Sequence, residues 1–225
     1  QRLSFSQQEI AARQLAFHLM QVAGLSVRMD GIGNLFGRLE GRDPELAPIW
    51  VGSHIDTVPS GGKFDGSVGV VSALEVARAL REDSELPVRS VEVAVFVSEE
   101  SSRFGLATIG SGIIAGIFQP GEFMELKDVE GYRLGDLLSS QGFDEDTIAS
   151  AQLSLGEVRA FLEVHIEQGR VLETEGLNIG IATAIANATR LRITYTGRAD
   201  HSGATPMHLR RDAFVAASHL TTYVE

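Results

Sequence analysis

The chain has 225 residues, 44% of them hydrophobic, which is enough to bury a substantial core and argues against a disordered protein. Its formal net charge of -11 disfavours nucleic-acid and anionic membrane partners, because their phosphates would repel it. It contains no cysteine, so disulfides and thiolate ligands are excluded and any metal must be held by histidine and carboxylates. Without a long apolar run or a secretory signal, we expect a cytoplasmic protein that acts on a small-molecule substrate.

Strands alternate with helices in the first part of the chain. Ser6 to Glu9 has the form of a capping box, which predicts a helix ending near Gly24, with an apolar stripe at Ile10, Leu15, Leu19 and Val22. Strands are expected at 25–29, 34–39, 48–53 and 91–98, a turn at 31–37 and a helix at 67–80. This order predicts an α/β fold, a layered mixed sheet with helices on both faces.

The later part of the chain changes in character. Residues 121–156 are acidic, punctuated by glycine and weakly helical, and we expect a surface excursion there. Strands are expected at 160–165, 178–185 and 189–196, with a helical turn after residue 169 and a helix at 212–224. Only the strand at 189–196 alternates apolar with polar residues, as a strand with one buried face does. We therefore expect one domain over residues 1–186 and the beginning of a second over residues 187–225.

Polar side chains gather at or just after the predicted strand ends, beginning with GSHIDTVPSGGKFDG at 52–66. Asp56 lies two residues after His54, so it can accept a hydrogen bond from the imidazole nitrogen that does not face a metal. Asp65 lies between glycines, where the backbone can approach a ligand closely. Each motif alone is more often a histidine satisfied at a strand end or an ordinary turn aspartate.

The adjacent carboxylates Glu99 and Glu100 end a buried apolar strand, where they would repel each other unless a cation binds or both reach water. His165 and Glu167, followed by Gln168, end another strand. Ligands collect outside the carboxyl ends of strands in α/β sheets, so these groups can meet in one site. Imidazole and carboxylate ligands suit zinc, manganese or cobalt.

His201 lies in the loop RADHSGATPM, beyond the alternating strand. If the second domain is a lid, this imidazole could close over a substrate carbonyl and stabilise the developing oxyanion. Spacing alone favours an ordinary loop histidine.

The motifs GSHIDTVPSGGKFDG, SEESSRFG, VHIEQG and ADHSGATPM, in this order, resemble the dinuclear-metal amidohydrolases that include N-carbamoyl-L-amino acid hydrolases, β-ureidopropionases and allantoate amidohydrolases. The resemblance covers nearly the whole chain. It implies a zinc-peptidase-like catalytic domain, incomplete at residue 186, followed by the beginning of an α+β lid or dimerisation domain.

The resemblance also implies site roles and two divalent metal ions. His54 and His165 would each ligate one ion, Asp65 would bridge the two, and Glu100 would complete the site beside His165 or its partner. Glu99 would take a proton from a metal-bridging water that attacks the substrate, and pass it to the leaving nitrogen. Three further residues would assist: Asp56 orients His54, Gln168 lies near the substrate, and His201 reaches the substrate from the lid, commonly across a homodimer interface.

Two features depart from the family pattern. Ser101 follows the glutamate pair where the family usually has glycine. Family members are nearly twice as long as this chain, which resembles their N-terminal half. A further metal-ligating histidine, and the asparagine and arginine residues that hold the substrate carboxylate, would come from the part following Glu225.

The leading functional hypothesis is hydrolysis of the ureido C–N bond of an N-carbamoyl-L-amino acid, with allantoate or another ureido or acyl-amino-acid substrate as the nearest rival. Aminoacylases and dipeptidases share the general metal layout, but HIEQG and ADHSGATPM favour the ureido branch. A catalytically silent module that only binds a metal or ligand is the alternative outside the enzymes. The presence of both Glu99 and Glu100 argues against it, because a binding module needs no base.

Overall fold

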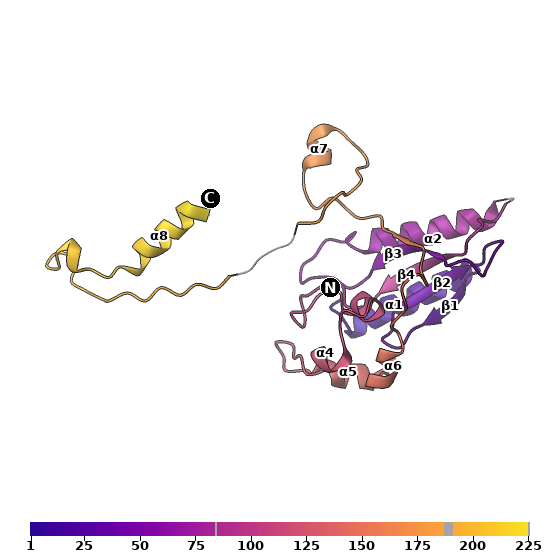
Figure 1. The fold of residues 1–225 in the computed structure, drawn as a ribbon, viewed down its shortest axis with the longest axis horizontal. Coiled ribbons are helices and arrows are strands. Elements are labelled where there is room, and N and C mark those ends of the chain that lie inside the picture. Colours follow the sequence, from indigo (N-terminus) through magenta and orange to yellow (C-terminus); the bar gives the residue numbers. More distant parts are fainter. Residues whose placement is uncertain (84, 187–190, 225) are drawn as a thin grey trace. The chain divides into compact units, whose positions relative to one another are not determined.

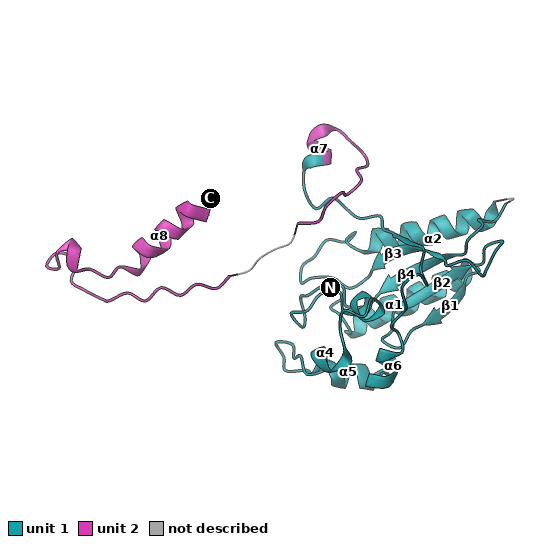
Figure 2. Ribbon diagram, viewed as in Figure 1, with its two compact units in different colours: residues 1–171 teal, residues 172–225 magenta. Residues whose placement is uncertain are grey.

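The computed structural model describes residues 1–83, 85–186 and 191–224. The chain divides into two compact units, Gln1–Val171 and Leu172–Glu225 (Figure 2). The predicted domain boundary at residue 187 falls outside the described residues, so it stays a prediction.

A five-stranded mixed sheet forms the centre of the first unit (Figure 1). Its strands are β1 (Ser26–Met29), β2 (Leu35–Leu39), β3 (Ile49–His54), β4 (Val91–Phe96) and β5 (Ala160–Leu162), in the order β1-β2-β4-β3-β5. β1 and β2 pair antiparallel, as do β2 and β4, whereas β3 runs parallel to both β4 and β5. The predicted mixed α/β sheet is therefore confirmed, with a shorter fifth strand than expected.

Every residue of β4 is buried, because helices cover both faces of the sheet there. On one face, Val93 and Val95 pack in a cluster with residues of α1 (Gln7–Val22) and α2 (Ser67–Glu82). On the other face, Ala94 and Phe96 pack with the aromatic side chains of β2 and β3 and with α3 (Ile109–Ile114). A nearly continuous apolar strand is the sequence pattern that such two-sided burial requires.

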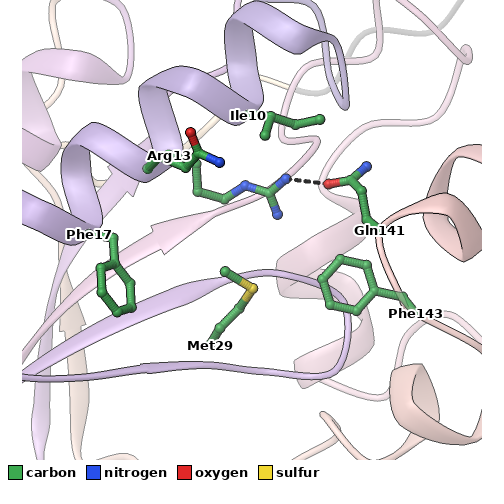
Figure 3. A pocket seen from close by; sticks show the side chains of 7 residues that line it. Ile10, Arg13, Phe17, Met29, Gln141 and Phe143 are labelled. Atoms are coloured by element: carbon green, nitrogen blue, oxygen red, sulfur yellow. Dashed lines mark hydrogen bonds between the residues drawn. The ribbon is translucent and has the colours of Figure 1, made fainter.

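The buried face of α1 differs from the apolar stripe that the sequence predicts. The Ser6 side chain caps the helix by accepting a hydrogen bond from the Glu9 backbone N–H, as expected. Three apolar side chains of the predicted stripe are exposed: Leu15, Leu19 and Val22. The buried face instead carries an ion pair, with Arg13 Nε 3.3 Å from Glu9 Oε1. Arg13 also donates to Gln141 Oε1 at 2.7 Å (Figure 3). Oε1 of Glu9 is buried and accepts no hydrogen bond among the described residues.

The expectation of a surface excursion at 121–156 is wrong. This segment forms α4 (Pro120–Phe123), α5 (Leu134–Ser140) and α6 (Glu145–Ala149). Four of its apolar side chains are fully buried in a second core with residues of the N-terminal segment and α3: Phe123, Leu134, Leu138 and Ile148. The three helices are only four, seven and five residues long, so they leave a weak helical pattern in the sequence.

The second unit contains α7, which begins at the unit boundary (Val171–Glu175), the short 3-10 helix η1 (Met207–Leu209) and α8 (Ala213–Val224). The strand expected at 178–185 is absent. Of the strand expected at 189–196, residues 191–196 are described, and they do not form a strand either. The apolar side chains of both segments are largely exposed. A strand requires a neighbouring strand to pair its backbone groups, and the described residues supply none. None of the described helices combines the length and apolar character needed to cross a bilayer.

Candidate metal centre

The parallel strands β3, β4 and β5 bring three polar clusters to one edge of the sheet. His54 is the last residue of β3, Glu99 follows β4, and His165 follows β5. Ser98 adopts the left-handed region, with φ of 51°, directly before the glutamate pair. Such a conformation is rare outside glycine and turns the chain sharply where β4 ends.

His54 is buried and its ring is held from one side. Its Nδ1 lies 3.0 Å from the backbone oxygen of Asp56 and 3.5 Å from Oδ1 of the same residue. Both contacts favour a proton on Nδ1, which leaves Nε2 free to face a ligand. Gly66 packs against the ring from α2: its φ is +63°, and a Cβ there would lie 2.6 Å from Cε1 of His54. Only glycine fits this position without displacing the imidazole.

Asp65 lies between the two predicted histidine ligands. Its Oδ1 is 3.3 Å from His165 Nε2 and 4.0 Å from His54 Nε2. This oxygen is buried and has no hydrogen-bond partner among the described residues. His165 Nδ1 lies 2.6 Å from the backbone oxygen of Ile166, so its Nε2 is also left facing Asp65. The other oxygen of Asp65 accepts a hydrogen bond of 2.7 Å from Gln168 Nε2.

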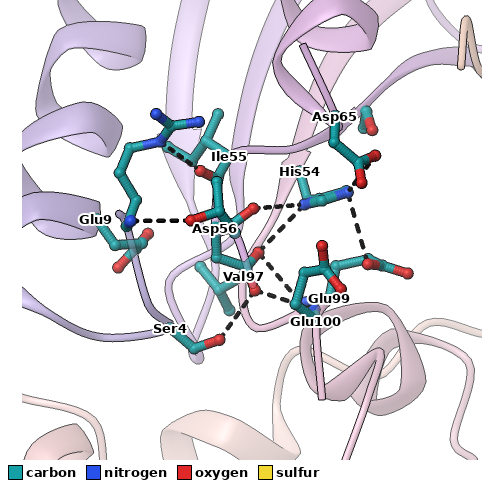
Figure 4. Close-up of polar contacts among 12 residues, drawn as sticks. Ser4, Glu9, His54, Ile55, Asp56, Asp65, Val97, Glu99 and Glu100 are labelled. Atoms are coloured by element: carbon teal, nitrogen blue, oxygen red, sulfur yellow. Dashed lines mark hydrogen bonds and ion pairs between the residues drawn. The ribbon is translucent and has the colours of Figure 1, made fainter. Parts of the chain in front are cut away.

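Glu99 and Glu100 lie on the other side of His54 (Figure 4). Glu99 Oε2 is 3.5 Å from His54 Nε2, and the Glu99 side chain is 37% exposed, which leaves it accessible to solvent and substrate. Burial raises the pKa of both glutamates, and the neighbouring carboxylates raise it further, against the opposing charge of His54. A carboxylate whose pKa is raised toward neutrality is suited to act as a general base.

The charges around His54 show that the site favours a cation. Burial alone would lower the pKa of His54, but the hydrogen bond and charge of Asp56, with the charge of Glu99, raise it to about 9. An ion that binds Nε2 must displace a proton from this imidazole and takes over its role of balancing the carboxylates.

The donor set fits a divalent metal ion. His54, Asp65 and His165 each offer one ligand atom, and these atoms lie within 4.8 Å of one another. His54, Glu99 and Glu100 form a second such group. The orphaned oxygen of Asp65 and the imidazole nitrogens that point toward it are what an ion would satisfy.

Asp56 organises the glutamate pair as well as His54. Its Oδ1 accepts a hydrogen bond from the Glu99 backbone N–H at 3.2 Å, and its Oδ2 accepts one from the Glu100 N–H at 3.0 Å. A further bond of 2.9 Å comes from the hydroxyl of Ser4 (Figure 4). No motif in the sequence identifies Ser4. Gly66, by contrast, was within reach of sequence reasoning because it follows Asp65 in a glycine-rich loop.

His201 lies in the second unit, whose placement relative to the first is not determined. Within that unit, Nδ1 of His201 accepts hydrogen bonds of 3.1 Å from the backbone N–H groups of both Gly203 and Ala204. An accepting Nδ1 leaves the proton of the neutral ring on Nε2. The loop therefore presents His201 as an exposed hydrogen-bond donor.

Two apolar grooves also lie in the first unit. One, of about 320 Å³, is lined by Arg13, Phe17, Met29 and Phe143 among others (Figure 3). The other, of about 310 Å³, lies between α1 and α2. Neither groove is lined by any of the predicted site residues. The candidate metal centre is therefore defined by its cluster of polar side chains and not by a cavity.

Three relatives are similar to this chain along its whole length. It is 43% identical over 224 residues to an N-carbamoyl-L-amino acid amidohydrolase of Geobacillus stearothermophilus, a match over 100% of this chain and 54% of that protein. It is 36% identical over 219 residues to an allantoate amidohydrolase of Bacillus subtilis, over 97% and 53% of the two chains. A crystal structure of a hydantoinase/carbamoylase family amidase from Burkholderia ambifaria matches with a TM-score of 0.80 and 34% identity, over 99% and 53%.

These matches confirm both the resemblance and the fold predicted from the motifs. The chain spans about half the length of the relatives that it matches. Residues 50–222, which include the sheet strands β3 to β5 and all the predicted ligands, match a sequence profile of one family. The chain belongs to Peptidase family M20/M25/M40.

Proposed function

We propose that this protein hydrolyses a ureido C–N bond, with an N-carbamoyl-L-amino acid as its substrate. The observation that carries the proposal is the convergence of His54 Nε2 and His165 Nε2 on the partnerless Oδ1 of Asp65, with Glu99 3.5 Å from His54. The names of the relatives support the reaction class, since they include both N-carbamoyl-L-amino acid and allantoate amidohydrolases.

In this proposal, His54 and His165 would each ligate one of two divalent ions, Asp65 would be shared by the two, and Glu100 would complete the site beside His165 or its partner. Zinc, manganese and cobalt all suit imidazole and carboxylate ligands. When bound, such ions polarise a carbonyl oxygen and lower the pKa of a water molecule. Asp56 keeps His54 in the orientation that points Nε2 at Asp65, and Gln168 fixes the Asp65 carboxylate through its 2.7 Å hydrogen bond.

Glu99 is the proposed base. It accepts a proton from the water that attacks the ureido carbonyl, and it then gives that proton to the nitrogen that leaves when the C–N bond breaks. Its raised pKa and its accessible side chain support both steps. His201 is proposed to donate from Nε2 to the carbonyl oxygen as negative charge develops there. Gln168, which holds Asp65, is also proposed to lie near the bound substrate.

Dimerisation through residues 187–225 remains a proposal drawn from the family resemblance. A cytoplasmic location and the limit of the catalytic domain near residue 186 remain proposals drawn from the sequence pattern. The presence of Glu99 argues against a silent binding module, because metal binding alone does not require a base at that position.

The test is ammonia release from a panel of substrates by the full-length protein loaded with zinc, manganese or cobalt. N-carbamoyl-L-amino acids should release ammonia, and a chelator should abolish the release. A preference for allantoate would overturn the N-carbamoyl amino acid assignment and favour the allantoate alternative. N-acetyl amino acids or dipeptides as the only substrates would overturn the ureido assignment, and a metal-loaded protein inactive on every compound would overturn the proposed enzyme.

A further inference from the structure

We propose that Ser4 is a positioning residue of the metal site proposed above: its hydroxyl fixes the Asp56 carboxylate, which orients His54 and the backbone of the glutamate pair. Ser4 lies outside every motif, near the beginning of the chain. It touches neither a metal ligand side chain nor a substrate, so its effect must pass through Asp56.

The N-terminal segment is fastened to the loop that follows β3. The Thr57 backbone N–H donates to the Arg2 carbonyl at 2.9 Å, and the Arg2 N–H donates to Thr57 Oγ1 at 3.0 Å. Arg2 Nε donates to the Ile55 carbonyl at 2.7 Å. These contacts on both sides of Asp56 bring the beginning of the chain next to its carboxylate.

Ser4 completes the hydrogen bonds of a buried carboxylate. Both Ser4 and Asp56 are 1% exposed, so water does not compete for their polar atoms. Ser4 Oγ donates to Asp56 Oδ2 at 2.9 Å, beside the donation from the Glu100 N–H to the same oxygen. The backbone donors approach from the β4 side, and the hydroxyl holds the carboxylate from the N-terminal segment. A buried carboxylate loses orientation as well as stabilisation when one such donor is removed.

The backbone of Ser4 is itself fixed by a hydrogen bond from a charged side chain. Arg103 Nη1 donates to the Ser4 carbonyl at 2.6 Å, and Arg103 Nε donates to Asp128 Oδ2 at 3.0 Å. The side chains of Arg103 and Asp128 are 12% and 5% exposed. A connected series of hydrogen bonds therefore runs from Asp128 through Arg103 and Ser4 to Asp56, and fixes the hydroxyl where it is needed.

Partners of metal-ligating histidines set ligand orientation, and their loss weakens metal binding. Ser4 acts one step further out, through the residue that orients His54. Removal of its hydroxyl should therefore lower metal affinity without removing any ligand. A serine with only a structural role would change stability alone.

The experiment compares Ser4→Ala with Ser90→Ala. Ser90 is a matched control, because it is 0% exposed and its Oγ accepts one long-range hydrogen bond, from the Gly41 N–H at 3.1 Å. For each variant, the dissociation constant for Zn²⁺ is measured by competition with a chelating dye, alongside the free energy of unfolding of the metal-free protein. Ser4→Ala should bind zinc about tenfold more weakly than wild type. Ser90→Ala should lose unfolding free energy and keep its zinc affinity.

Ser4→Thr keeps a hydroxyl donor and should recover most of the zinc affinity. Wild-type affinity in Ser4→Ala, an equal loss of affinity in Ser90→Ala, or no recovery in a stably folded Ser4→Thr would each overturn the role of Ser4. The proposed function fails separately: a wild-type protein that binds no divalent ion overturns the metal site, and with it any role for Ser4 there.

Discussion

Nε2 of His165 lies 3.3 Å from Oδ1 of Asp65, although one residue follows β5 and the other lies in the loop between β3 and α2. The carboxylate oxygen is buried and has no hydrogen-bond donor among the described residues. Such a pair is unfavourable unless a cation or a proton lies between the two atoms. A divalent ion bound there would satisfy both atoms.

Asp65→Asn should weaken binding of zinc by about 100-fold or more, because the amide removes the charge that the two imidazoles and the ion share. Isothermal titration calorimetry measures the change. Asp43→Asn is the matched control, since Asp43 is exposed and, among the residues that the structure describes, its side chain accepts only a bond from the Glu45 N–H. Equal affinity in Asp65→Asn and Asp43→Asn would show that Asp65 is not a ligand.

Glu99→Gln should retain metal and lose turnover by about 10² to 10⁴-fold, because glutamine cannot accept the proton of the attacking water. His54→Ala should instead lose metal. Metal content after dialysis and ammonia release from an N-carbamoyl-L-amino acid separate the two effects. The assigned roles would be contradicted by equal metal loss in both variants.

Gly66→Ala should distort the site and destabilise the fold by at least about 2 kcal/mol, because an alanine is strained in the left-handed region. The new Cβ would also lie 2.4 Å from the backbone oxygen of His54. Urea unfolding measures the loss. Gly62→Ala is the control, since a Cβ at Gly62 meets nothing within 4 Å and its φ is not positive. Similar unfolding free energies for the two variants would refute this account of Gly66.

The free energy of unfolding should fall as pH rises from about 4.5 to 7, because burial raises the pKa of Glu9 from 4.5 to about 7. The folded state holds this proton more tightly than the unfolded state, so the stabilisation is full below pH 4.5 and is lost above 7. The difference amounts to about 3 kcal/mol at most. Urea unfolding of wild type and Glu9→Gln across this range measures it. Glu9→Gln should flatten the dependence, and parallel curves would contradict the assignment.

The sequence predicted the parts of the fold that depend on strand-length hydrophobic patterns. β4 was recognisable because all six of its residues, Val91–Phe96, are buried and the run is apolar almost throughout. The prediction of an apolar buried stripe on α1 was wrong, for a physical reason. The helix buries a paired Glu9 and Arg13, which periodicity counts as surface residues, and it leaves Leu15 exposed. Burial of charge depends on a partner that only the folded chain supplies.

The same distinction separates the site residues that were predicted from those that were not. His54, Asp65, Glu99 and His165 could be found because parallel strands carry their ends to one edge. Ser4 could not be found, because its link to the site is a long-range hydrogen bond to Asp56. Gln168 was expected near the substrate, but its hydrogen bond to Asp65 could not be foreseen, because it joins residues 103 positions apart. The prediction of a strand at 178–185 was wrong for a related reason, because strand formation depends on a pairing partner as well as on the hydrophobic pattern of the sequence.

Metal content after exhaustive dialysis is the measurement that tests the central claim most directly. Wild-type protein and the double variant His54→Ala/His165→Ala are loaded with zinc, dialysed and analysed for bound metal, with X-ray absorption to identify the ligands. The account predicts that the wild type retains zinc bound by nitrogen and oxygen ligands, including imidazole, and that the double variant retains none. Equal zinc retention by the two proteins would contradict the metal centre.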